Sequence, residues 1–128
     1  MKITFPQIQT FINSYEEIKN NKMPLPLAFG LSRIAKQAEE CLSFYQDRYN
    51  SYLEQYAEKD EDGYKLTENK KGIVLKQETI SEAHQKFKEL DNWEFTLDIK
   101  KIPLSDFEKL ELSPSDLIGF LPFIYEEN

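Results

Sequence analysis

The chain is poor in the residues that build most catalytic and metal sites. Its 128 residues include one cysteine, one histidine and four glycines. Cys41 alone cannot form an internal disulfide, and with one histidine it cannot complete a zinc site of nitrogen and sulfur ligands. The four glycines stand far apart, so no glycine-rich loop can cradle a phosphate. We therefore expect a protein that is not an enzyme and that uses no cofactor.

Positive charge and long apolar runs are also scarce. Lysine and arginine number 16 against 23 aspartate and glutamate residues, a net charge of −7. This balance repels the phosphates of nucleic acids and of anionic lipids, so we expect no direct binding to either. The longest apolar stretch, 118–125, is too short to span a bilayer, and the N-terminal residues lack the apolar run of a signal peptide. The sequence predicts a soluble intracellular protein.

The residues that are present predict an α+β fold in a single domain, 1–128. Spacings of three and four between apolar residues predict a short helix within 1–23 and a long helix within 24–62. We expect the remainder, 63–128, to form a hairpin, a helix, a strand and a short C-terminal helix. The strands would make a small antiparallel sheet of about three strands packed with the helices.

The long helix carries the strongest pattern in the chain. A near-heptad seam runs along it and consists of Leu27, Leu31, Ile34, Ala38, Cys41, Tyr45, Tyr49, Tyr52 and Tyr56. A helix of about thirty residues is roughly 45 Å long, more than a compact domain of this size requires. It must therefore project beyond the core, lie against another helix, or pair with a second chain to give a homo-oligomer.

The distal half of this seam changes from aliphatic residues to tyrosine. Tyr45, Tyr49, Tyr52 and Tyr56 follow one face, with Phe44 and Leu53 beside them. A core stripe is one interpretation of this row. Because a tyrosine ring buries apolar area while its hydroxyl keeps a polar partner, the row also suits a surface that contacts another protein. We predict these four tyrosines as partner-binding residues.

Local signals place the other elements. Residues 64–67 and 73–76 predict a hairpin with the loop 68–72, and Thr79 with Glu82 predicts a capping box. Strict alternation over 93–99 predicts a strand, and Ser113-Pro114 predicts a helix start. The expected core is Leu31, Ile34, Ala38, Leu42, Phe87, Leu90, Phe95, Leu97, Leu117 and Leu121.

Three further features are candidates for chemical sites. His84 is expected at a surface or boundary, and a pocket converging on it would instead argue for an enzyme. Cys41 is expected as a small buried side chain of the helix seam. Glu58, Asp60, Asp62 and Gly63 match the start of a calcium loop, but its twelfth position is Asn69 and not glutamate. A solvated turn is the preferred interpretation, and an ion at this turn stays an open alternative.

An ordered set of motifs resembles a group of small proteins encoded by tailed bacteriophages and prophages. In order they are Leu25-Pro26, the YxExDEDG turn at 56–63, Glu89-Leu90, the strand 93–99, Ile102-Pro103-Leu104-Ser105-Asp106, the LSPxDL helix start at 112–117, and Pro122-Phe123-Ile124 before an acidic end. Ala57 stands where a glycine is often found. The group has no assigned activity, so the resemblance implies a phage setting and no site residues.

Together these observations favour a non-enzymatic phage protein that acts through protein–protein contacts. It would be an assembly factor or a minor virion component, found in the host cytoplasm or the virion, with phage structural proteins as partners. The alternative is a counter-defence inhibitor of a host nucleic-acid-binding enzyme, with its carboxylates standing in for phosphates. That alternative requires the carboxylates to cluster on one face.

Overall fold

The computed structural model confirms the α+β fold class and describes residues 1–127. Over this range the helices are α1 (Phe5–Ile18), α2 (Leu25–Tyr56), α3 (Ile80–Asp91) and α4 (Pro114–Phe120). The strands are β1 (Lys2–Thr4), β2 (Lys59–Asp60), β3 (Gly63–Tyr64), β4 (Glu94–Thr96), β5 (Ile102–Pro103) and β6 (Ile124–Tyr125). The strands pair in twos, as β1–β4, β2–β3 and β5–β6, in place of the single sheet of about three strands that we expected.

The chain divides into two compact units. Unit 1 contains Met1–Ser43 and the segment from Glu94 onward, and unit 2 is Phe44–Trp93. Helix α2 contributes residues to both. The sequence predicted 1–128 as a single domain, and each compact unit is described by itself below.

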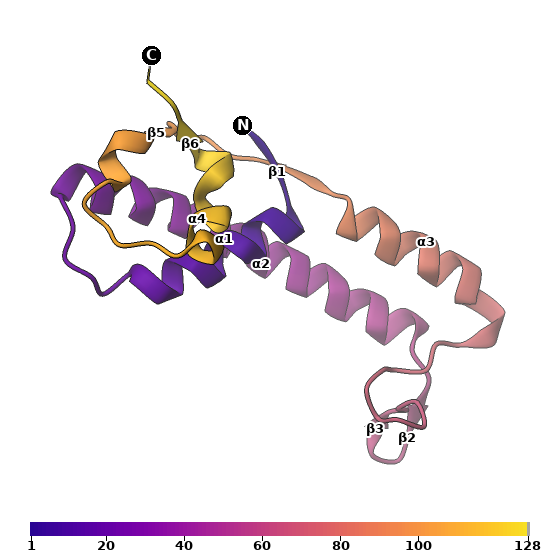
Figure 1. The fold of residues 1–128 in the computed structure, drawn as a ribbon. Coiled ribbons are helices and arrows are strands. Elements are labelled where there is room, and N and C mark those ends of the chain that lie inside the picture. Colours follow the sequence, from indigo (N-terminus) through magenta and orange to yellow (C-terminus); the bar gives the residue numbers. More distant parts are fainter. Residues whose placement is uncertain (128) are drawn as a thin grey trace. The chain divides into compact units, whose positions relative to one another are not determined.

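In unit 1, helices α1 and α4 pack side by side (Figure 1). Helix α1 begins where Gln7 Oε1 accepts a hydrogen bond of 3.0 Å from the Thr4 backbone N–H, with proline next in the first turn. Its buried face meets α4 at Gly119, where a Cβ atom would stand 2.1 Å from Ser14 Oγ. Only glycine therefore allows the two helices to approach this closely.

Strand β4 of unit 1 is shorter than the alternating pattern predicted. It pairs antiparallel with β1, an N-terminal strand that the sequence analysis did not identify, with Ile3 opposite Phe95. Beyond β4, Leu97 still pairs with Met1, its N–H donating to the Met1 carbonyl at 2.8 Å. At the next residue the Gln37 side chain takes the place of a partner strand. Gln37 Nε2 donates to the Asp98 carbonyl and Oε1 accepts from the Asp98 N–H, both at 2.9 Å.

The unit 1 core confirms most of the aliphatic side chains expected there. Leu31, Ile34, Ala38, Phe95 and Leu97 are buried, whereas Leu42 and Leu117 are only half-buried and Leu121 is exposed. The buried apolar side chains of unit 1 that the expected core set did not include are Ile3, Ile8, Phe11, Ile18, Leu27, Ile102, Phe107, Phe120 and Phe123. The expected face of the C-terminal helix was therefore wrong: α4 packs through Gly119 and Phe120 and turns Ile118 outward.

Strands β5 and β6 bring distant parts of unit 1 together. They pair in parallel, with Ile102 opposite Ile124 and Pro103 opposite Tyr125. The Ser105 hydroxyl also donates to a Glu127 carboxylate oxygen at 3.2 Å. The segment following β4 is thereby held beside the C-terminal strand.

In unit 2, the distal part of α2 packs against α3. The buried apolar side chains of unit 2 are few: Leu53, Tyr56, Ala57, Ala83 and Leu90. Phe87, which we expected in the core, is half-buried. Unit 2 thus has a small core, with several aromatic rings lying at its edge.

The segment between α2 and α3 confirms the predicted hairpin. Leu66 bridges Ile73, and the Thr67 N–H donates to the Gly72 carbonyl at 2.9 Å across the expected loop. Strands β2 and β3 form a second, shorter hairpin ahead of it. Its turn is possible because Gly63 adopts a φ of +113°, which other residues rarely reach.

The capping box predicted at Thr79 is wrong. A 3₁₀ turn, Gln77–Thr79, precedes α3 and leaves Thr79 with φ −125° and ψ 13°, outside the extended geometry of a capping residue. Its hydroxyl makes no capping hydrogen bond. Thr79 Oγ1 is in fact a buried polar side-chain atom with no hydrogen-bond partner within residues 1–127.

Candidate functional site

The four predicted tyrosines lie in unit 2, along α2 where it faces α3. Tyr49 is 39% exposed, Tyr45 and Tyr52 are half-buried, and Tyr56 is 2% exposed. The stacking rings of Tyr45 and Tyr49 are 6.2 Å apart. Tyr56 belongs to the core of unit 2, whereas the other three tyrosines keep some exposed surface.

Contacts with α3 fix the positions of these rings. The Phe87 ring lies 5.3 Å from that of Tyr49 and 5.7 Å from that of Tyr52, centroid to centroid. The Tyr45 hydroxyl donates to Asp91 Oδ1 at 2.6 Å. Burial, together with this carboxylate, raises the pKa of Tyr45 well above its ordinary value. The hydroxyl therefore stays protonated and holds α3 to α2.

A groove opens beside the tyrosine row within unit 2. We call it the aromatic groove, and it is lined by Phe44, Arg48, Tyr52, Lys86, Glu89, Leu90 and Trp93. Its volume is about 230 Å³. The residues of α2 that line the groove are four positions apart, so they share one helix face. The other wall consists of residues of α3 and of Trp93, which follows this helix.

Phe44 contacts both another ring and an arginine in the aromatic groove. The Phe44 and Trp93 rings lie 6.0 Å apart, and the Arg48 guanidinium lies 5.5 Å from the Phe44 ring centre. Trp93 is 50% exposed and precedes β4, although the predicted strand began at residue 93. The sequence analysis noted Phe44 only as a neighbour of the tyrosines and missed Arg48. The spacing of Phe44, Arg48 and Tyr52 was the signal that could have revealed this face.

The aromatic groove is lined by side chains that are suited to binding. Exposed aromatic rings and arginine are the side chains enriched at the centres of protein interfaces. The groove contains no serine, cysteine or histidine that could act as a nucleophile or as a base near neutral pH. Lys86 and Glu89 provide polar groups at its rim.

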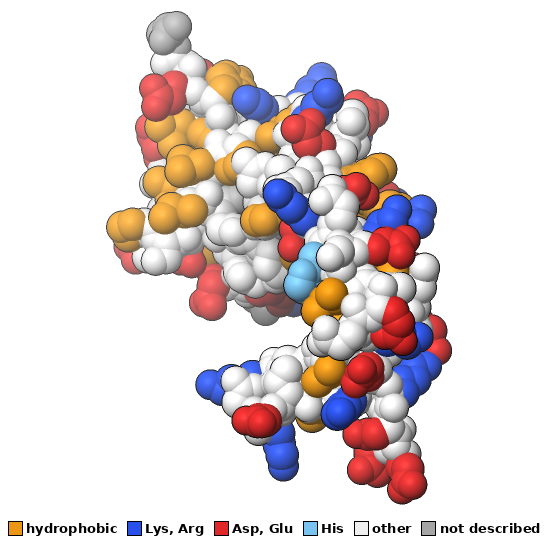
Figure 2. Space-filling view, turned by 90° about the vertical axis from the view of Figure 1, so that its right-hand side faces the viewer, with side chains coloured by type: hydrophobic (Ala, Val, Ile, Leu, Met, Phe, Trp, Pro, Cys, Tyr) orange, Lys and Arg blue, Asp and Glu red, His pale blue; other side chains and the backbone are white. Residues whose placement is uncertain are grey.

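The other residues considered as chemical sites do not converge. His84 is exposed on α3, and Figure 2 shows the histidine side chain at the surface. Cys41 is half-buried, and burial raises the pKa of its thiol. Asp60 Oδ1 accepts from the Asp62 N–H at 2.9 Å, which stabilises the acidic turn directly. Across residues 1–127, no three histidine, cysteine, aspartate or glutamate side chains gather to hold a metal ion.

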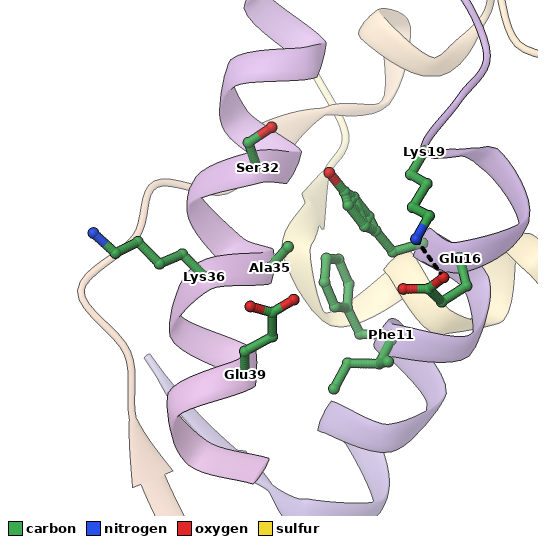
Figure 3. A pocket seen from close by; sticks show the side chains of 9 residues that line it. Phe11, Glu16, Lys19, Ser32, Ala35, Lys36 and Glu39 are labelled. Atoms are coloured by element: carbon green, nitrogen blue, oxygen red, sulfur yellow. Dashed lines mark ion pairs between the residues drawn. The ribbon is translucent and has the colours of Figure 1, made fainter. Parts of the chain in front are cut away.

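A second pocket lies in unit 1 between α1 and α2 (Figure 3). It has a volume of about 240 Å³ and mixes rings with charges of both signs. Glu16 and Lys19 at its edge form an ion pair of 2.7 Å, which raises the pKa of Lys19. In this view the Phe11 ring lies between this pair and Glu39, which stands on α2 with Ala35. The charged side chains of this pocket are of both signs, and its apolar side chains do not form a continuous wall that would favour one class of ligand.

Charge is divided nearly evenly between the units. Unit 2 contains eleven acidic and eight basic residues, a net charge of −3, and the remaining −4 belongs to unit 1. On the face shown in Figure 2, carboxylates and cationic side chains are interspersed. This distribution does not favour an acidic surface that imitates nucleic acid.

Comparisons with known proteins add no assignment to these observations. No protein-family model, curated protein or solved structure matches the chain. Among the helices of the described chain, none combines the length and apolar character that crossing a membrane requires.

Proposed function

We propose that this protein acts without catalysis, by binding other proteins, as a phage assembly factor or minor virion component. Its partners are phage structural proteins, and its place is the host cytoplasm or the virion. The aromatic groove of unit 2 is the surface on which the partner docks. The phage setting is inferred from the ordered sequence motifs, and the mode of action is inferred from the aromatic groove.

The observation that carries the proposal is the exposure of Trp93 beside Phe44 and Arg48. A tryptophan side chain that is 50% exposed retains a large apolar area in contact with water. Covering this area on association yields roughly 25 cal/mol per Å² removed from water. Tryptophan, tyrosine and arginine are also the residues whose truncation most often weakens protein complexes.

The arrangement of the groove limits what binding costs. The Phe44 and Trp93 rings already contact each other, and the Arg48 guanidinium already lies over Phe44. Side chains that are positioned before association lose less conformational entropy when a partner arrives. The tyrosine row supports this arrangement through Tyr52, which contacts Phe87 and lines the groove.

Site-specific photo-crosslinking in infected host cells tests the proposal. A benzophenone amino acid replaces Trp93 in one variant and Leu66, exposed on the hairpin of the same unit, in a control variant. We expect the first variant to crosslink to a phage structural protein and the second to give a much weaker product. The crosslinked proteins are then identified by mass spectrometry.

The same experiment can contradict the proposal in two ways. Equal products from positions 93 and 66 would show that the groove is not the docking surface. A host nuclease or polymerase as the crosslinked protein would favour the counter-defence inhibitor instead. Adding Arg48→Ala to the first variant is a further test, because it removes the cation of the groove without opening a buried cavity and should reduce the crosslink from position 93.

A further inference from the structure

A second groove lies in unit 1, separate from every residue of the aromatic groove. The first turns of α2 form one wall and the segment 99–106, which includes β5, forms the other. Its volume is about 210 Å³. Gly30 leaves the floor open, because a Cβ atom there would stand 3.0 Å from Ile102 Cδ1. We call this the basic groove.

Cations surround the basic groove although the protein is acidic. Arg33, Lys100 and Lys101 line it, against one carboxylate from Asp106. No ion pair joins any of these three cations to another residue in 1–127. Three positive groups and one carboxylate thus meet at one place in a chain whose net charge is −7. Such a local potential attracts a negatively charged ligand.

An exposed ring completes the basic groove. Phe29 is 62% exposed, and the Arg33 guanidinium lies 5.8 Å from the centre of its ring. One turn earlier on the same face of α2, Leu25 is 80% exposed. The ligand must therefore bring apolar area as well as negative charge.

The size of the basic groove distinguishes between classes of ligand. Small-molecule sites usually enclose about 300–1,000 Å³, more than this groove provides. A groove of about 210 Å³ accepts one or two side chains of a peptide, with the flanking residues on the rim. A nucleic acid is disfavoured, since Phe29 is a single exposed ring and the surrounding protein is acidic.

We infer that the basic groove binds an acidic peptide segment of a partner protein. An apolar side chain of the segment packs between Phe29 and Ile102, and carboxylates on either side meet Arg33, Lys100 and Lys101. The recognition is thus charge-complementary at the rim and apolar in the centre. It is independent of the aromatic groove, so the protein has a distinct docking surface on each unit.

Titration of the full chain with a labelled probe peptide tests this inference. The probe carries a pair of leucines flanked by glutamates, and binding is followed by fluorescence anisotropy and by amide chemical shifts. We expect shifts confined to residues 26–33 and 99–106, and weaker binding at higher salt. Phe29→Ala should weaken binding about tenfold, as for an interface anchor.

Matched variants separate local charge from net charge. Lys101→Glu and Lys22→Glu change the net charge equally, but Lys22 lies in the exposed connector between α1 and α2 and does not line the groove. We expect Lys101→Glu to weaken binding of the probe about fivefold and Lys22→Glu to leave it nearly unchanged. Because all these side chains are exposed, the variants should fold normally.

Four outcomes would overturn the inference. The first is an equal effect of the two charge reversals, and the second is equal binding of a probe whose glutamates are replaced by glutamine. The third is tighter binding of a single-stranded oligonucleotide that shifts the same amides. The last is a concentration-dependent dimer in sedimentation whose interface is this groove, which would make a second copy the occupant.

Discussion

The cores of the two units differ in composition and in completeness. In unit 1, Ile8, Phe11, Leu27, Phe120 and Phe123 are fully buried, and helices approach closely enough to require Gly119. In unit 2 the buried set is small, and Phe87, Tyr49 and Tyr52 remain partly in contact with water. Unit 1 therefore resembles a tightly packed protein interior, and unit 2 resembles half of an interface.

This difference has a consequence for stability. Regions with few buried apolar contacts open more easily than regions with many. We therefore expect unit 2 to unfold locally at a lower free energy than unit 1. The same incomplete burial leaves its rings available to a partner, which would add the missing contacts on binding.

The largest effect is expected from a charge in the core of unit 1. Leu97→Asp places a carboxylate at a buried position, next to Asp98, whose backbone N–H is bonded by Gln37. An unpaired buried charge costs several kcal/mol of unfolding free energy. We expect unit 1 to unfold, measured as loss of the cooperative melting transition by circular dichroism. Leu121→Asp, at an exposed position of the same unit, is the control and should melt close to the unchanged protein.

A smaller effect is expected where α1 and α4 meet. Gly119→Ala adds a Cβ atom 2.1 Å from Ser14 Oγ and 2.6 Å from the Thr10 carbonyl oxygen, so the helices must separate. Overpacking of this kind costs about 1–3 kcal/mol of unfolding free energy. Gly72→Ala is the control in unit 2, because its nearest neighbour would be at 3.5 Å. Similar losses from both, measured by urea denaturation, would contradict the tight packing of unit 1.

The third prediction concerns the aromatic contacts of unit 2. Phe87→Ala removes the ring between Tyr49 and Tyr52 and should cost about 2 kcal/mol, less than a fully buried ring would. Native-state hydrogen exchange should show the loss in amides of α3 while protection of α1 persists. If the amides of α1 lost protection equally, the two units would unfold together and the proposed difference in stability would be wrong.

The smallest effect is expected at Thr79. Its hydroxyl is buried without a hydrogen-bond partner, so Thr79→Val replaces a desolvated polar atom with a methyl group of similar size. We expect the unfolding free energy of unit 2 to be unchanged or to rise by about 1 kcal/mol. A decrease of that size in thermal or chemical denaturation would mean that the hydroxyl forms a bond in solution.

Local patterns predicted the elements whose stabilising groups are close in sequence. The seam of α2 is buried from Leu27 to Ala38 as its spacing indicated, and Ser113 Oγ accepts from the Asp116 N–H at 3.1 Å as a capping residue. The turn at Gly63 and the hairpin loop ending at Gly72 were also predicted correctly. Each depends on residues within a few positions of one another.

Elements that depend on distant residues were predicted less well. Strand β1 exists because it pairs with β4, more than ninety residues away, and its three residues carry no pattern of their own. The buried face of α4 is set by α1 at Ser14, which no spacing within 114–120 could reveal. Thr79 failed as a cap because the 3₁₀ turn before it changed its backbone geometry.

The candidate site was predicted in part for the same reason. The tyrosine row was recognised because its members repeat along one helix, but the aromatic groove also needs Trp93, which lies just beyond α3. Alternation with Phe95 and Leu97 assigned Trp93 to a strand face. The strand begins only at Glu94, so the chain ahead of it is free to direct the indole into the groove of unit 2.

The position of Trp93 also makes the protein its own optical reporter. It is the single tryptophan of the chain, and it lies in unit 2 at the aromatic groove. Emission from the indole therefore follows unit 2 alone, whereas helical ellipticity follows both units. A ligand that fills the groove should shift this emission to shorter wavelength and shield it from a dissolved quencher, without any label being attached.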